Sequence, residues 1–240
     1  MTPRLKPFFL YFGAKWRGAP HYPVPDHDTI VEPFAGAAGY ATRFPDRQVI
    51  LVDRFPAIVK TWEYMIQTPE SEILALPDVV AGTTVDDYDL PEGARCLIGW
   101  WLNHGSSSPR KSMSSWGRQC PDSFWGQMIR ERIARQLHAI RHWKVIQGDY
   151  SDAPDVNATW CIDPPYQDAG RNYKFGSSTL DYQELGEWCR TRRGQVIVCE
   201  NEGAHWLPFS PLFLAKSASG KHRPRSHRME VIWTSPEQKA

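Results

Sequence analysis

The stretch "ATWCIDPPY", residues 158–166, joins an unbroken apolar run to an abrupt polar stop. An apolar run without polar alternation is typical of a strand buried on both faces, as in a parallel sheet covered by helices. The strand must end at Pro164 and Pro165, because proline cannot donate to a sheet ladder. Asp163 then lies at the carboxyl end of a buried strand, which is where ligands bind in open α/β sheets.

Six other β-rich runs follow the same plan, and each ends in turn or charged residues. Helical segments lie between them, over 56–68 and 180–193. Alternation of strands and helices predicts an α/β fold with a mostly parallel sheet. The last two runs are joined by a basic, glycine-containing loop, and we expect them to form an antiparallel edge hairpin. The six runs are 28–36, 47–55, 142–150, 194–202, 210–217 and 228–235.

Residues 123–143 carry the clearest helical pattern in the chain. Apolar residues recur every three or four positions, which predicts one buried stripe with a basic outer side. Asp122 or Ser123 is the expected N-cap. The stripe comprises Trp125, Met128, Ile129, Ile133, Leu137 and Ile140.

Composition places the chain among soluble globular proteins, with 41% hydrophobic and 23% charged residues. No apolar run approaches the ~20 residues of a membrane span, and the first residues lack the pattern of a signal peptide. The five cysteines are scattered without a CxxC pair. We therefore expect no zinc site, no disulfide framework and a reducing, cytoplasmic setting.

Charge is segregated along a chain whose net charge is only +1. Residues 63–92 are acidic, whereas 104–144 and 216–228 are rich in Lys and Arg. The first basic block belongs to a long insertion before the run at 142–150, and four Trp lie in residues 100–125. Interleaved aromatic and basic residues suit stacking on bases and contact with phosphates. Ordinary solvated surface charge is the alternative interpretation of either block.

Two features before residue 60 fit a nucleotide site. "IVEPFAGAAGY", residues 30–40, runs from an apolar strand into a glycine-rich turn, where backbone N–H groups and a helix start could approach a ligand. Asp53 ends the next run, where such folds place an acid for ribose hydroxyls. Each feature alone also fits a purely structural turn or helix cap, but their spacing together favours a nucleotide.

The stretch Asp163–Tyr166 suits recognition of a planar amino group. The prolines fix the backbone and remove two N–H donors, so neighbouring carbonyl oxygens can face outward. Asp163 adds an ionised acceptor, and Tyr166 offers a flat face for a ring. A strand exit stiffened by proline is the alternative.

The ordered set "PFFLYFGAK" (7–15), "VEPFAGAAG" (31–39), "VDRF" (52–55) and "IDPPY" (162–166) resembles the Dam-like, D12 class of S-adenosylmethionine-dependent DNA adenine-N6 methyltransferases. The resemblance covers most of the chain apart from the insertion. It implies a Rossmann-like methyltransferase fold, with a seven-stranded sheet and a target-recognition insertion. Residues 1–60 and 142–240 would form the catalytic domain, and 61–141 the DNA-recognition region.

The resemblance also implies roles for individual residues. Tyr11 stands where the family usually has Trp, and Lys15 matches the motif's lysine, which would touch the methionine carboxylate of the cofactor. Catalytic roles fall on Asp163, Pro164, Pro165 and Tyr166. Contacts to the cofactor, S-adenosyl-L-methionine, fall on Tyr11, Lys15, Glu32, Pro33, Phe34, Gly36, Asp53, Asp149, Tyr150 and Asp163. Backbone contacts to double-stranded DNA are expected from Arg110, Lys111, Arg118, Lys221, Arg223 and Arg225.

The expected activity is methyl transfer to adenine N6 after the base is flipped out of the duplex, by a monomer that needs no metal. Hydrogen bonds from the N6 hydrogens to the Asp163 carboxylate and the Pro164 carbonyl would localise the nitrogen lone pair. The same motif could polarise N4 of cytosine or an amino group in RNA. A catalytically silent DNA-binding protein with the same fold is a further alternative.

Overall fold

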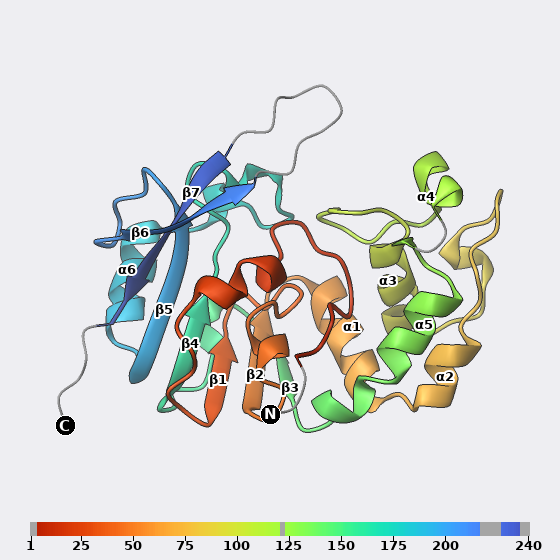
Figure 1. The fold of residues 1–240 in the computed structure, drawn as a ribbon, viewed down its shortest axis with the longest axis horizontal. Helices are drawn as coiled ribbons and strands as arrows, with labels where there is room; N and C mark the ends of the chain where they lie inside the picture. Colours follow the sequence, from red (N-terminus) through yellow and green to blue (C-terminus); the bar gives the residue numbers. More distant parts are fainter. Residues whose placement is uncertain (1–3, 121–122, 217–226, 236–240) are drawn as a thin grey trace.

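The computed structural model describes residues 4–120, 123–216 and 227–235. Its centre is a seven-stranded sheet with the order β3-β2-β1-β4-β5-β7-β6 (Figure 1). All seven strands fall on the seven runs predicted from the sequence. Their bounds are β1 Thr29–Glu32, β2 Gln48–Asp53, β3 Lys144–Gln147, β4 Ala158–Ile162, β5 Gly194–Asn201, β6 Ser210–Lys216 and β7 His227–Thr234.

The prediction of a mostly parallel α/β sheet with an antiparallel edge hairpin is confirmed. Strands β1 to β5 pair in parallel, and β7 pairs antiparallel with both β5 and β6. In the sheet, β7 lies between β5 and β6, so β6, which comes earlier in the sequence, is the edge strand. Pro211 interrupts the register of β6, which an edge strand tolerates because its outer N–H groups need no partner.

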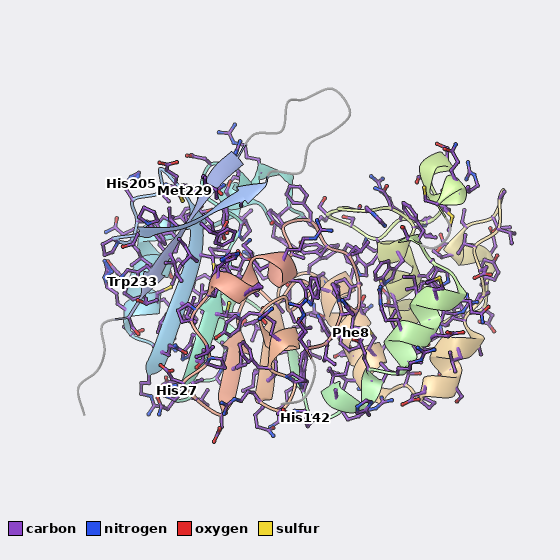
Figure 2. All side chains as sticks on the ribbon, in the orientation of Figure 1. Phe8, His27, His142, His205, Met229 and Trp233 are labelled. Carbon is purple, nitrogen blue, oxygen red and sulfur yellow. The ribbon has the colours of Figure 1, made fainter. Side chains whose placement is uncertain are left out.

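Successive residues of each buried strand contribute to different hydrophobic layers, as the two-residue period of a strand requires. Ile30 of β1 packs into one layer, and its neighbour Val31 packs into the other. The first layer lies under α1 (Pro56–Gln67), α3 (Glu92–Trp101) and α5 (Gln127–Ala134), and it also holds Phe8 (Figure 2). The second layer lies under α6 (Tyr182–Arg190). Burial on both faces explains the unbroken apolar runs in the sequence.

Helical segments between β2 and β3 gather beyond the β3 side of the sheet (Figure 1). They include α2 (Glu70–Ala75) and α4 (Ser115–Gln119), together with α1, α3 and α5. Helix α3 packs on α1, and α2 packs on α5. Across the described residues, none of the helices is both long and apolar enough for a membrane span.

The single helix predicted over 123–143 is wrong in its extent. Helix α5 begins at Gln127, and a separate 3-10 turn covers Leu137–Ile140. Trp125 is held outside the helix, because its backbone N–H donates to Trp101 and its indole donates to Pro77. The N-cap is Gly126, whereas Asp122 lies outside the described residues. Met128 was placed in the buried stripe but is 61% exposed, while the other five members of the stripe are buried.

The contact between α1 and α3 generates a test of the packing. Gly93 faces α1 so closely that an added Cβ would lie 2.5 Å from the Lys60 carbonyl oxygen and 2.5 Å from Tyr64 Cβ. We expect Gly93→Ala to lower the free energy of unfolding by about 1–3 kcal/mol, since overpacking outweighs the better helix propensity of alanine. Urea titration followed by circular dichroism measures the change.

Gly186→Ala is the matched control, because it makes the same substitution within α6. The nearest atom to a Cβ there is the Trp206 carbonyl oxygen at 3.0 Å, a distance that a small adjustment relieves. A Gly93→Ala protein as stable as the parent would contradict the close packing of the two helices.

Candidate active site at the carboxyl ends of β1, β2 and β4

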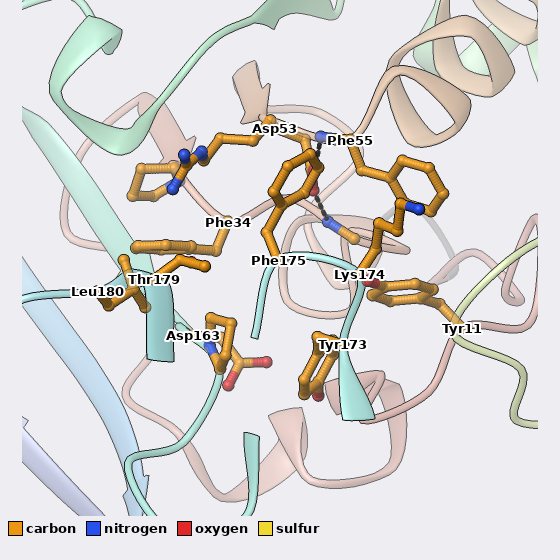
Figure 3. Close-up of a pocket in the computed structure, with 14 residues that line it drawn as sticks. Tyr11, Phe34, Asp53, Phe55, Asp163, Tyr173, Lys174, Phe175, Thr179 and Leu180 are labelled. Atoms are coloured by element: carbon orange, nitrogen blue, oxygen red, sulfur yellow. Dashed lines mark hydrogen bonds between the residues drawn. The ribbon is translucent and has the colours of Figure 1, made fainter. Parts of the chain in front are cut away.

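The main pocket lies where strand order reverses between β1 and β4, at the carboxyl ends of the parallel strands. Its volume is about 550 Å³, including space that opens to solvent. Aromatic and aliphatic side chains surround a few polar groups (Figure 3), as in most small-molecule sites. The lining residues are Tyr11, Pro33, Phe34, Gly36, Asp53, Arg54, Phe55, Asp163, Pro165, Tyr173, Lys174, Phe175, Thr179 and Leu180.

Asp53 is fixed at the end of β2 by two backbone donors (Figure 3). Oδ2 accepts from Gly36 N–H at 2.9 Å, and Oδ1 accepts from Phe55 N–H at 2.8 Å. Gly36 has φ +45°, a conformation that glycine adopts without strain. Burial raises the pKa of Asp53 to about 6, although both hydrogen bonds oppose the shift. Each carboxylate oxygen has a second lone pair, so Asp53 can also accept hydrogen bonds from hydroxyl groups of a ligand.

The helix start expected after the glycine-rich turn is absent. Residues 33–47, all described, contain only the 3-10 turn Ala41–Arg43. Pro45 disfavours a helical conformation at Phe44, which has φ −128° and ψ 57°, so a helix could not continue past Arg43. The buried carboxylate of Glu32 accepts from Ala41 N–H at 2.7 Å and holds the turn against β1.

A second hollow of about 400 Å³ adjoins the main pocket and contains Lys15 and Glu32. The two hollows share five lining residues, including Asp163 and Tyr11. Lys15 reaches this place because Gly39 has no side chain, since a Cβ there would lie 2.6 Å from Trp16 N and 2.9 Å from Lys15 N. The N-terminal segment and the glycine-rich turn are therefore in direct backbone contact.

Lys15 and Asp163 form an ion pair between the two hollows. Lys15 Nζ lies 2.9 Å from Asp163 Oδ1 and also donates to the Gly13 carbonyl oxygen at 3.1 Å. The same ammonium lies 4.5 Å from the centre of the Tyr166 ring, in a cation–π contact. One cation thus joins the acid and the aromatic residue of the Asp-Pro-Pro-Tyr stretch.

Burial changes the titration of all these groups. Burial raises the pKa of Asp163 to about 6, although the Lys15 ammonium opposes this. Burial disfavours the charged form of Lys15, but Asp163 and Glu230 outweigh it, so the pKa of Lys15 lies above its ordinary value. Burial also raises the pKa of Glu32 to about 8. Asp163 and Glu230 therefore both act on the Lys15 ammonium group.

Tyr166 and Pro164 are buried, whereas Pro165 is half-buried and lines the main pocket. Tyr166 is only 9% exposed, and its hydroxyl donates to Glu230 of β7. The Pro165 carbonyl oxygen accepts from the Tyr182 hydroxyl, so it is engaged within the protein. Pro164 is buried and is not among the described residues that line either hollow.

Two of the predicted cofactor residues stand behind the pocket. Asp149 and Tyr150 are not among the described residues that line either hollow. Tyr150 stacks on Phe34 with ring centres 5.6 Å apart, and Asp149 Oδ2 lies 3.5 Å from the Arg54 guanidinium. They support pocket residues instead of facing the cavity.

The structure adds site residues that the sequence patterns did not single out. Tyr173 packs its ring against Tyr11 at 5.8 Å, and the guanidinium of Arg54 lies 5.1 Å from the centre of the Phe175 ring. Alternating aromatic residues in the polar segment after Tyr166 were the available signal. For Glu230, the signal was an acid at an inward position of the apolar strand "RMEVIWT".

The predicted DNA contacts are separate from the pocket. Arg110, Lys111 and Arg118 are exposed and are not among the described residues that line either hollow. Lys111 pairs with Asp86 at 2.5 Å, and Arg118 donates to the Met113 carbonyl oxygen at 2.8 Å. The remaining three, Lys221, Arg223 and Arg225, lie outside the described residues.

Nothing in the described part of the chain gathers three or more His, Cys, Asp or Glu side chains into a metal-binding group. His27 and His142 lie at the edge of the molecule opposite the carboxyl ends of the parallel strands (Figure 2). Comparison with known proteins gives no match to a family model and no match to a curated protein.

The raised pKa of Glu32 leads to a pH-dependent stability. The folded protein keeps this proton up to about pH 8, whereas the unfolded chain releases it near its ordinary pKa of 4.5. The stabilising contribution is complete below pH 4.5 and is lost as pH rises toward 8. Glu32→Gln keeps an oxygen acceptor for Ala41 N–H, so its stability should fall less between these pH values.

We expect the difference between parent and Glu32→Gln to change by on the order of 5 kcal/mol over this interval, at about 1.4 kcal/mol per pKa unit. Urea denaturation at several pH values measures it. Glu187→Gln, at an exposed position of α6, is the control and should follow the parent. Parallel pH profiles for the parent and Glu32→Gln would contradict the assignment.

Proposed function

We propose that this protein is an S-adenosylmethionine-dependent DNA methyltransferase with a Rossmann-like fold, which transfers a methyl group to adenine N6 in double-stranded DNA. The observation that best supports this proposal is the position of Asp163. Its carboxylate lines both hollows, and Asp53 lines the larger of the two. The same carboxylate pairs with Lys15, whose ammonium lies over the Tyr166 ring. The strand order β3-β2-β1-β4-β5 supports the fold assignment, because doubly wound folds share it.

The lining of the pocket fits S-adenosylmethionine. Asp53 has the acceptors for ribose hydroxyls, and Phe34, Phe175 and Leu180 supply an apolar wall for an adenine ring. Lys15 offers an ammonium for a carboxylate in the adjoining hollow. When bound, the cofactor supplies an electrophilic methyl group on a sulfonium.

Asp163 would activate the target amine. Adenine N6 is a weak nucleophile because its lone pair is delocalised into the ring. A carboxylate that accepts a hydrogen bond from N6 localises this lone pair and stabilises the positive charge that develops on nitrogen. Lys15 binds Oδ1 of Asp163, so we assign the contact with the base to Oδ2. The pKa of Asp163, raised to about 6, leaves the carboxylate ionised at neutral pH.

A flipped base needs a stacking surface, and Tyr166 would supply it. The ring is 9% exposed, and the Lys15 ammonium lies 4.5 Å from its centre. Entry of the base therefore requires the Lys15 ammonium to leave the face of the ring. The exposed residues Arg110, Lys111 and Arg118 would contact DNA phosphates, because Arg and Lys side chains supply most backbone contacts.

Methylation in cells tests the proposal directly. DNA from cells that express the protein should carry N6-methyladenine at defined sequences, as read by sequencing that detects modified bases. Asp163→Ala should abolish the modification, because it removes the acceptor for the amine, and its circular dichroism spectrum and urea denaturation curve establish that the variant is folded.

Other results would contradict this assignment. N4-methylcytosine in the DNA, or methylated RNA, would reassign the substrate on the same site. Full activity of Asp163→Ala would contradict the mechanism, and no methyl transfer to DNA or RNA would favour a DNA-binding protein without activity.

Asp53 provides a test of the cofactor site alone. Asp53→Ala removes the acceptors for ribose hydroxyls, and each hydrogen bond to a charged group is worth about 1.5–3 kcal/mol. We therefore expect affinity for S-adenosylmethionine to fall by more than tenfold in isothermal titration calorimetry, at about 1.4 kcal/mol per factor of ten. Asp149→Ala, behind the pocket, is the matched control and should bind more tightly than Asp53→Ala. Equal affinities for the parent and Asp53→Ala would contradict the ribose role.

A further inference from the structure

The side of Tyr166 away from the pocket carries a buried group of hydrogen bonds that the proposed chemistry does not use. Glu230 Oε1 accepts from the Tyr166 hydroxyl and from the Tyr22 hydroxyl, the latter at 2.7 Å. Glu230 and Tyr22 are each only 5% exposed. Residues from three distant parts of the chain therefore meet at a single carboxylate oxygen.

Glu230 is an unusual residue for its position. It lies near the start of β7, opposite Asn201 of β5, and shares a face of the strand with the buried Ile232. A buried carboxylate is expensive to desolvate unless hydrogen bonds or a cation compensate for the loss of water. Two phenol hydroxyls provide this compensation, and the ammonium of Lys15 is close enough to interact with Glu230.

The contacts fix the Tyr166 ring at both its edge and its face. The hydroxyl is bound to a strand that pairs on both sides, and the Lys15 ammonium lies over the ring. Glu230 is not among the described residues that line either hollow, so it has no direct access to a ligand there. Its hydrogen bond toward the site is made through the Tyr166 side chain, and its charge also acts on Lys15 and Asp163.

We propose that Glu230 is a positioning residue that, together with Tyr22, holds the Tyr166 ring in the orientation that receives the target base. This rests on the proposed function for its consequence in catalysis. The hydrogen-bond arrangement itself belongs to the protein without any substrate. The two parts can therefore be tested separately.

The first experiment examines the free protein by nuclear magnetic resonance, with tyrosine labelled with ¹³C in its ring. Tyr166→Phe identifies the Tyr166 signal, which it removes. Glu230→Gln should shift or broaden that signal, because the ring loses its charged acceptor and samples more than one orientation. Glu202→Gln is the matched control, since it removes the same charge at an exposed position beside β7, and should leave the signal in place. An unchanged Tyr166 signal in Glu230→Gln overturns the proposal.

The second experiment measures single-turnover methyl transfer and affinity for S-adenosylmethionine. Glu230→Gln should lower the rate constant by on the order of 10–100-fold, as expected when a group is displaced in a site that works by positioning. Tyr166→Phe keeps the Glu230 charge near Lys15, so cofactor affinity should be unchanged in that variant. Tyr166→Phe, which keeps the ring and loses only the bonded hydroxyl, should show a similar loss of rate.

The double variant Glu230→Gln/Tyr166→Phe separates positioning from a general structural effect. If Glu230 acts through the Tyr166 hydroxyl, the double variant should be no slower than either single variant. Additive losses overturn the proposal, as does a loss of cofactor affinity in Tyr166→Phe. If the parent transfers no methyl group, the proposed function fails, while the resonance experiment still tests the role of Glu230. If Glu230→Gln does not fold, the Tyr166 signal in Tyr22→Phe takes its place and should shift or broaden.

Discussion

The partly buried ion pair between Lys15 and Asp163, whose side chains are 14% and 19% exposed, determines how the site is assembled. It connects the N-terminal segment to the carboxyl end of β4, two parts of the chain that are remote in sequence. Removing two charges from water is unfavourable, and their attraction compensates only when the geometry is fixed. That geometry depends on Gly39, where any side chain would collide with the backbone of Lys15 and Trp16. The glycine-rich turn therefore serves the ion pair as well as the pocket.

The strands were predictable because burial on both faces imposes continuous apolar runs, as in Val49–Val52 and Val196–Cys199. The failures arose where tertiary contacts override a local pattern. Trp125 donates to Trp101 and Pro77 across the insertion, which delays the start of α5 to Gln127. Helical spacing in the sequence contains no information about such partners.

The residues of the candidate site also divide into those that a local sequence pattern predicted and those that depend on tertiary contacts. Asp53 and Asp163 could be predicted because each directly follows a buried strand, and the carboxyl ends of parallel strands meet at one edge of the sheet. Lys15 was predicted as a site residue only from a family resemblance, and in the structure it pairs with Asp163. Glu230 and Tyr166 are 64 positions apart in the sequence and meet because β7 pairs with β5. The order of strands along the sequence does not show that β7, rather than β6, is the neighbour of β5.

The two acids of the main pocket have a consequence for binding and stability together. Burial raises the pKa of both Asp53 and Asp163 to about 6, so it disfavours their charged forms in the free protein even though Lys15 pairs with Asp163. A ligand that brings a positive charge or hydrogen-bond donors would lower these pKa values and recover stability. A ligand without them would leave the acids uncompensated. The raised pKa values of Asp53 and Asp163 are thus the property through which a cationic, hydroxyl-bearing ligand would stabilise the folded protein.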